Sequence, residues 1–202
     1  YIMGEEHPIP ELNLPIEAHG RILRLLAHDV PVEMEVNIQN TFYSNSKVVN
    51  VMGEIAGTDK NLKDQIVLVG GHLDSWHGGT GAADNASGGI VMMEALRILK
   101  ALGVQPKRTI RIALWGGEEQ GLHGSRGYVE KYLRDRETMN LKPGFENFDV
   151  YFNMDNGSGK FRGVHLQGNE MIKPIFEQWL SPFASMGCST LNIGNTGGTD
   201  HL

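Results

Sequence analysis

The sequence has a single cysteine, Cys188, so an intrachain disulfide and a zinc site built from paired cysteines are both excluded. No apolar run reaches about 18 residues, the length that a membrane-spanning helix needs. The net charge is −6 and there is no basic run, which argues against nucleic acid as a partner. No signal-peptide pattern opens the chain, and it has neither internal repeats nor low-complexity segments.

The composition that remains is that of an ordinary globular protein. Hydrophobic residues make up 40% and charged residues 21% of the 202 residues, which is enough chain for one domain with a sizeable core. Many of the 26 glycines stand beside acids and histidines. Glycine lets the backbone approach other groups closely, so this clustering predicts loops that surround something bound.

Short apolar segments alternate with segments of helical spacing. Strands are expected at 32–36 (continuing toward Phe42), 48–55, 66–70, 109–115 and 150–154. Helices are expected at 18–26, 90–102, 125–136 and 172–183. The second places Val91, Ala95, Ile98 and Leu102 on one face, and its apolar stripe is broad because Met92, Leu96 and Leu99 lie close by. This order predicts a three-layer α/β/α sandwich with a mixed, mostly parallel central sheet, in which the first two strands pair antiparallel.

The domain organisation is expected to be simple. Residues 1–15 contain three prolines and no periodicity, so we expect a connector from an upstream region. Residues 16–202 form the predicted domain, whose C-terminal part is expected to continue past Leu202.

Acids and histidines follow the expected strands, where ligands gather at the carboxyl edge of a parallel sheet. The residues at these strand ends are His72, Asp74, Glu118, Glu119 and Asp155. In addition, Asp84 opens a helix, and His201 follows a glycine-rich loop. The pattern predicts a metal site, with Asp74 as an orienting partner of His72.

The number of these side chains suits two zinc ions. Two imidazoles and three carboxylates, one of them shared, give each of two ions about 3.5–4 Å apart three protein ligands and leave a position for water. Glu118 and Glu119 are adjacent and cannot point the same way from an extended segment. One would then bind metal while the other faces the water as general base. Asp200 is a rival to His201 as a ligand.

A dinucleotide-binding loop is the alternative interpretation of Gly79-Thr80-Gly81. The third glycine of that motif is replaced by Asp84, and an acid at this position would repel a pyrophosphate. The metal-site interpretation therefore has the stronger support.

Five segments, in order, resemble the M28 family of co-catalytic zinc peptidases. They are Gly-His-Leu-Asp-Ser-Trp (71–76), Gly-Ala-Ala-Asp-Asn-Ala-Ser-Gly (81–88), Gly-Glu-Glu-Gln-Gly-Leu-His-Gly-Ser (117–125), Asn-Met-Asp-Asn-Gly (153–157) and Gly-Thr-Asp-His (198–201). The resemblance covers about residues 17–202.

The resemblance implies a role for each candidate residue. His72 and Asp155 would hold one zinc, Glu119 and His201 the other, and Asp84 would bridge the two. Glu118 would be the general base, and Asp74 would orient His72. The peptide bond between Asp84 and Asn85 would be cis. Cobalt or manganese would be accepted in place of zinc.

The implied activity is release of N-terminal amino acids from a peptide substrate. The alternatives are a carboxypeptidase or dipeptidase on the same scaffold, a one-zinc aminoacyl cyclase relative, and a degenerate receptor-like domain without metal. The resemblance also implies a secreted or periplasmic protein. It sets no oligomeric state.

Overall fold

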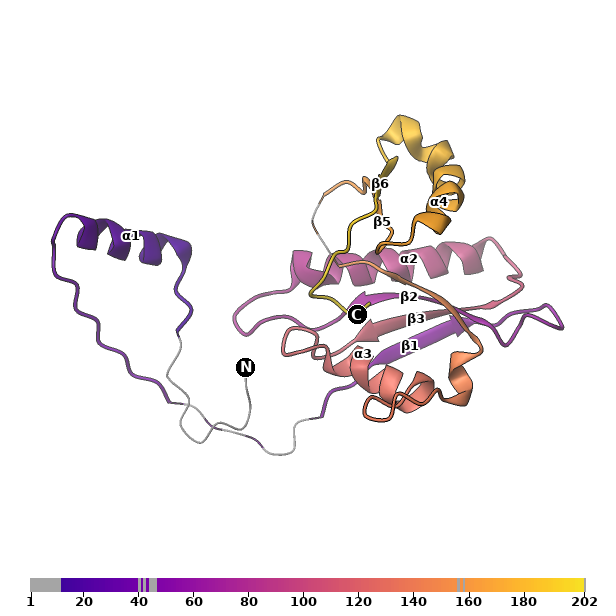
Figure 1. Cartoon of the computed structure of the whole chain (residues 1–202), viewed down its shortest axis with the longest axis horizontal. Coiled ribbons are helices and arrows are strands. Elements are labelled where there is room, and N and C mark those ends of the chain that lie inside the picture. Colours follow the sequence, from indigo (N-terminus) through magenta and orange to yellow (C-terminus); the bar gives the residue numbers. More distant parts are fainter. Residues whose placement is uncertain are drawn as a thin grey trace. The chain divides into compact units, whose positions relative to one another are not determined.

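The computed structural model describes residues 12–39, 41, 43, 47–155, 157 and 159–201 (Figure 1). The chain divides into a unit that ends at residue 46 and a second unit that begins at Lys47. The described part of the first unit contains one helix, α1 (Ile16–Ala27), where helical spacing predicts one. Of the expected connector, residues 1–11 lie outside the described residues.

The strand expected at 32–36 is absent. This segment has no regular secondary structure, and the side chains of Met34 and Val36 are 63% and 53% exposed. Alternation supplies one apolar face, but a strand also needs a neighbour for its backbone hydrogen bonds. No described residue pairs with this segment. The expected continuation is also absent at residues 37–39, and Phe42 lies outside the described residues.

The second unit contains a four-stranded mixed sheet. Its strands are β1 (Val51–Ile55), β2 (Ile66–His72), β3 (Thr109–Trp115) and β4 (Phe148–Asn153), in the order β1-β3-β2-β4. β1 runs antiparallel to β3, whereas β2 is parallel to both β3 and β4. The predicted mixed, mostly parallel sheet is therefore confirmed, with the carboxyl ends of three strands at one edge. The expected antiparallel pairing of the first two strands is wrong, because the antiparallel pair is β1 with β3.

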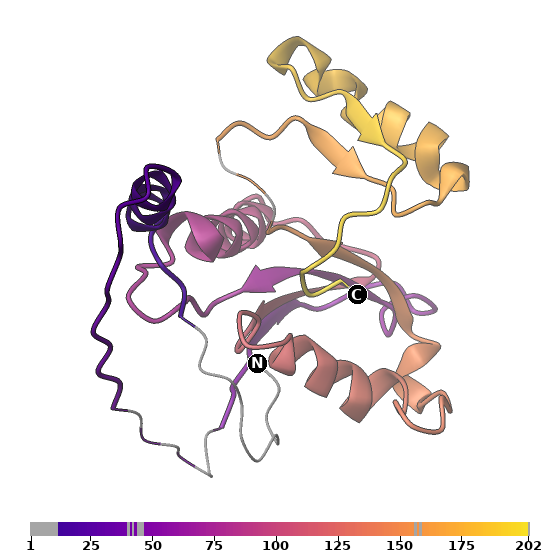
Figure 2. The ribbon, with the colours of Figure 1, turned by 60° about the vertical axis from the view of Figure 1, so that its left-hand side comes forward.

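Helices cover both faces of this sheet, as the predicted three layers require. Figures 1 and 2 show α2 (Ser87–Ala101) on one face and α3 (His123–Tyr128) on the other. The chain after α3 continues as a π-helical turn, Val129–Leu133. The core between the sheet and this second helical layer consists of Leu68, Ala113, Trp115, Tyr128 and Leu133.

The buried face of α2 is one side of the broad stripe expected for it. Val91, Ile98 and Leu102 are 48%, 43% and 73% exposed, whereas Met92, Leu96 and Leu99 are half-buried. Gly88 and Gly89 are buried where the helix begins. Their lack of side chains lets the helix approach the sheet there, and the 3.6-residue period carries that face through Met92, Leu96 and Leu99.

A second sheet of two short parallel strands, β5 (Gly163–His165) and β6 (Thr190–Asn192), was not predicted. Three residues are too few to reveal an alternating pattern. Between them lies α4 (Lys173–Leu180), whose Phe176 packs edge-on against Phe152 of β4, with ring centroids 6.3 Å apart. Among the described residues, no helix is long and apolar enough to cross a membrane.

Candidate metal centre

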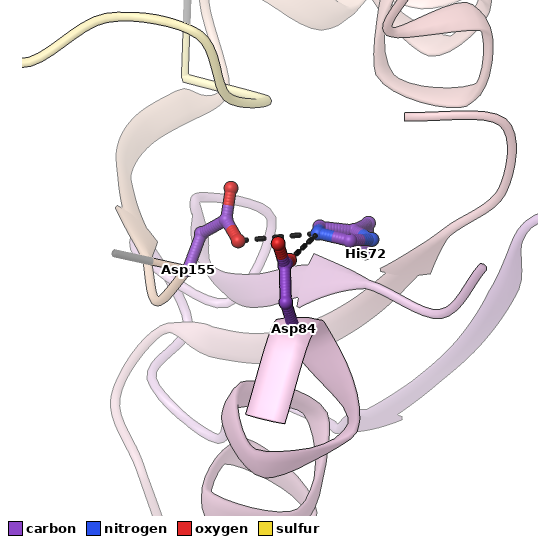
Figure 3. A group of neighbouring side chains, drawn as sticks. All are labelled: His72, Asp84 and Asp155. Carbon is purple, nitrogen blue, oxygen red and sulfur yellow. Dashed lines mark hydrogen bonds and ion pairs between the residues drawn. The ribbon is translucent and has the colours of Figure 1, made fainter. Parts of the chain in front are cut away.

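Three side chains from three separate elements converge at the carboxyl edge of the sheet (Figure 3). His72 is the last residue of β2, and Asp155 follows β4. Asp84 lies in the short segment η1 (Ala82–Ala86) before α2, where the backbone is not helical at Asp84 and Asn85. The Nε2 atom of His72 lies 3.0 Å from Oδ1 of Asp84 and 3.1 Å from Oδ1 of Asp155. These residues are among those that the sequence singles out.

The donor set fits a zinc ion. Ligands about 2.0–2.1 Å from a tetrahedral zinc are about 3.3 Å from one another, close to the separations between His72 and the two aspartates. The ligand atoms of His72, Asp84 and Asp155 all lie within 4.8 Å of one another, as do those of His72, Glu118 and Glu119. His72 thus belongs to two adjoining candidate groups, which are made of imidazole and carboxylates.

Glu118 and Glu119 both approach His72, contrary to the expectation that they diverge. That expectation assumed an extended segment, but the two residues lie in a bend and turn after Gly116 and Gly117. Gly117 has a φ of 65°, which glycine adopts without strain. Oε2 of Glu118 lies 3.9 Å from Nε2 of His72.

Asp74 contacts both sides of the site. Its backbone carbonyl lies 3.0 Å from Nδ1 of His72, while its carboxylate oxygen is 3.7 Å from that nitrogen. The carboxylate instead accepts hydrogen bonds from the backbone N–H groups of Glu118, at 3.0 Å, and Glu119, at 3.3 Å. Asp74 therefore contacts His72 mainly through its carbonyl and the glutamate turn through its side chain, and its role in orienting His72 stays a prediction.

Burial and charge shift the proton equilibria of the site. Burial raises the pKa of Glu118 to about 7; the positive charge of His72 opposes this rise, and the charges of Asp155 and Asp200 add to it. For His72, burial acts to lower the pKa, but the hydrogen bond to Asp155 and the charges of Asp155 and Glu118 outweigh it and raise the pKa to about 9. The metal-free site therefore holds a cationic imidazole among carboxylates.

These side chains line an open hollow of about 360 Å³. The His72 side chain is only 1% exposed and forms its floor, whereas the Asp84 side chain is 70% exposed. The described residues that line the hollow include no lysine or arginine; they are His72, Ala83, Asp84, Glu118, Glu119, Asp155, Gly157 and Gly198. The surface is therefore strongly acidic.

His201 does not belong to either candidate group among the described residues. Its Nε2 atom lies 3.0 Å from the backbone carbonyl of Thr196. The rival ligand Asp200 is buried and accepts a hydrogen bond from Ser125 at 2.6 Å. The role of His201 as the fifth ligand stays a prediction.

The sequence did not predict the structural role of Asn85, whose side chain is buried (1% exposed). Its side-chain N–H donates to the backbone carbonyl of Met154, and its Oδ1 accepts from the N–H of Gly88. A Cβ atom at Gly71 or Gly88 would collide with the same carbonyl. Asn85 thus ties the start of α2 to the end of β4. The peptide bond between Asp84 and Asn85 is cis, as the resemblance implies.

Comparison of the sequence with known proteins gives a consistent result. The model of peptidase family M28 matches residues 50–202. Carboxypeptidase Q from Homo sapiens is 31% identical over 173 residues, which are 86% of this chain and 34% of that protein. Leupeptin-inactivating enzyme 1 from Streptomyces exfoliatus is 34% identical over 113 residues, 56% of this chain and 25% of that protein. The chain thus spans about a third or less of these relatives.

Solved structures give the same picture. A peptidase M28 precursor from Shewanella amazonensis superposes with a TM-score of 0.61 and 30% identity, covering 75% of this chain and 32% of that chain. A zinc aminopeptidase from Bacillus subtilis superposes with a TM-score of 0.57 and 31% identity, covering 75% of this chain and 36% of that chain.

Proposed function

The chain belongs to peptidase family M28, and from this premise we propose that it carries the metal-binding core of an exopeptidase that releases N-terminal amino acids. The observation that supports this most directly is the convergence of His72 with Asp84 and Asp155, 3.0 and 3.1 Å away, beside the buried Glu118. Such a cluster suits a divalent cation better than a buried ion pair, because it gathers several carboxylates around one imidazole.

The proposed ligands are His72, Asp84, Glu119 and Asp155, with His201 as the predicted fifth. The relatives named as zinc aminopeptidases support zinc, and the ligand set leads us to propose two ions. When bound, zinc would polarise the scissile carbonyl and make water more acidic. His201 would have to release the carbonyl of Thr196, or use its other ring nitrogen, to take part.

Glu118 is the proposed general base. Its buried carboxyl has a pKa of about 7, close to the value at which a group can both accept and return a proton near neutral pH. It would take a proton from the attacking water and deliver it to the nitrogen of the departing amine. Asp74 would hold the backbone of this glutamate in place.

The charge of the hollow favours an amino terminus as the recognised end of the substrate. The described lining contains four carboxylates and no lysine or arginine, so an α-ammonium group would be attracted and an α-carboxylate repelled. A carboxypeptidase is the second candidate, because carboxypeptidase Q is 31% identical over 86% of this chain. A secreted or periplasmic location stays a prediction.

The two activities are separated by blocked substrates. We expect the zinc-loaded protein to hydrolyse leucine amide and leucine p-nitroanilide, and to leave peptides with an acylated amino terminus intact. Cleavage of an N-acylated dipeptide with a free carboxylate, without cleavage of leucine amide, would select the carboxypeptidase. One metal ion per chain would favour the aminoacyl cyclase relative, and no bound metal would favour the receptor-like domain.

A further inference from the structure

The short segment after β6 returns to the four-stranded sheet (Figures 1 and 2), and its Gly198 lines the hollow of the candidate metal centre. Two adjacent residues of this segment, Thr199 and Asp200, are 0% and 6% exposed. Burying a carboxylate and a hydroxyl is unfavourable unless each finds a hydrogen-bond partner. The partner of Asp200 lies in α3, on the side of Glu118, and the partner of Thr199 lies in β4, on the side of Asp155.

Asp200 is attached to the side that carries the proposed general base. Its Oδ1 atom accepts a hydrogen bond of 2.6 Å from the hydroxyl of Ser125, which is 5% exposed and belongs to α3. The two residues just before α3 are hydrogen-bonded to the glutamate turn, because the N–H groups of Gly121 and Leu122 both donate to the carbonyl of Glu118. Asp200 therefore connects to Glu118 through Ser125 and the turn that leads into α3.

Thr199 is attached to the side that carries Asp155. Its hydroxyl oxygen accepts a hydrogen bond of 2.7 Å from the side-chain amide of Asn153, the last residue of β4. Asn153 is fixed in turn, since its Oδ1 accepts from Tyr151, whose hydroxyl oxygen accepts from Trp115 in the core. Asn153 lies two residues before Asp155, so Thr199 is attached to the strand end that carries this proposed ligand.

We propose that Thr199 and Asp200 form a clamp that fixes the position of Glu118 relative to Asp155, with Asp200 and Ser125 as positioning residues on the side of the base. The effect of the clamp on catalysis rests on the proposed function. Its hydrogen bonds do not, because they are present in the metal-free protein. Neither Ser125 nor Asp200 lines the hollow, so both act through other residues.

The catalytic test is a double-mutant cycle on kcat and KM for leucine amide. A displacement of a catalytic group by about 1 Å can cost about 100-fold in rate, so we expect Ser125→Ala and Asp200→Ala each to lower kcat by about 10- to 100-fold. KM and zinc content should stay close to wild type. The double variant should be no slower than the slower single variant, because both substitutions break the same hydrogen bond.

Two further variants separate positioning from general damage. Asp200→Asn keeps an oxygen that can accept from Ser125, and a neutral amide is less costly to bury than a carboxylate, so it should retain most of kcat. Ser181→Ala removes an exposed hydroxyl at the end of α4, outside the hydrogen bonds of the clamp, and should leave kcat unchanged. Additive losses in the double variant, or losses that track zinc content, would overturn the clamp.

Hydrogen exchange in the metal-free protein tests the clamp without activity. Ser125→Ala should lower the protection of the amides of Gly121 and Leu122, whereas Ser181→Ala should not. Unchanged protection at both amides would contradict the clamp even if Asp200→Ala fails to fold. If the wild-type protein hydrolyses no peptide, the proposed function fails, and the exchange experiment still decides the clamp.

Discussion

The side chain of Asp74 and the backbone of Glu118 are joined by a hydrogen bond of 3.0 Å, and the same carboxylate also accepts from the N–H of Glu119. The carbonyl of Asp74 meanwhile faces Nδ1 of His72. One residue thus links a proposed metal ligand on β2 with the proposed base after β3. Its two functions use different atoms, so they can be separated by mutation.

Asp74→Asn should weaken catalysis more than metal binding. The asparagine side chain has one oxygen, which can accept from only one of the two backbone N–H groups, and its –NH₂ group would face the second N–H. The backbone carbonyl that faces His72 is unchanged. We expect kcat/KM to fall by about 10- to 100-fold, because a catalytic group displaced by about 1 Å can cost about 100-fold in rate. Steady-state kinetics together with metal analysis would show this. Asp64→Asn, at an exposed acid, is the control. Full activity with Asn at position 74 would contradict the assignment.

Glu118→Gln should abolish most activity while the zinc site stays filled. Glutamine has nearly the same shape but cannot accept a proton, and a general base contributes about 100- to 10,000-fold. The measurement is kcat for leucine amide, with zinc content determined on the same sample. Turnover close to wild type would rule out Glu118 as the base.

The metal-free protein should lose stability as pH rises from about 5 to 9. The pKa of Glu118 is raised from 4.5 to about 7 in the folded state, so its stabilising contribution is present below 4.5 and is lost as pH rises through 7. The pKa of His72 is raised from 6.5 to about 9, so its contribution is present below 6.5 and is lost as pH rises through 9. Both effects have the same sign.

Thermal unfolding in the presence of a chelator measures this dependence. We expect Tm to fall by several degrees over the range, since a loss of about 1 kcal/mol lowers Tm by about 2–4 °C in a protein of this size. Glu118→Gln should flatten the lower part of the curve, between pH 4.5 and 7, and leave the upper part. A Tm that rises with pH in the wild-type protein would refute the proton assignments.

Zinc should bind more tightly as pH rises from 7 to 9. In the metal-free protein His72 is protonated over this range, and zinc must displace that proton because it binds neutral imidazole. The affinity should therefore rise by up to about tenfold per pH unit. Competition with a chromogenic chelator gives the constants. Asp155→Asn should weaken binding and also reduce the pH dependence, because it removes the charge that raises the pKa of His72.

The features that the sequence predicted are those with a local pattern in the chain. β3 has the predicted bounds, Thr109–Trp115, because an apolar run is followed directly by two glycines and two glutamates. The convergence of His72, Asp84 and Asp155 could be anticipated because parallel strands place their carboxyl ends at one edge. The resemblance to a known family supplied individual roles that spacing alone left open.

Features that depend on distant partners could not be predicted. The segment 32–36 has the alternation of a strand but lacks a pairing neighbour among the described residues. The hydrogen bond between Ser125 and Asp200 joins residues 75 positions apart and leaves no periodic pattern. The approach of Glu118 and Glu119 to one imidazole depends on the conformation of a turn, which the assumption of an extended segment misjudged.

Where β2, α2 and the segment after β4 meet, Gly71 and Gly88 place only hydrogen atoms against the carbonyl of Met154. The width of the site is consequently set by backbone contact and not by the ligands themselves. Redesign of the centre for a larger cation would therefore have to begin at these two glycines, since longer or shorter acids at the rim leave the spacing of the three elements unchanged.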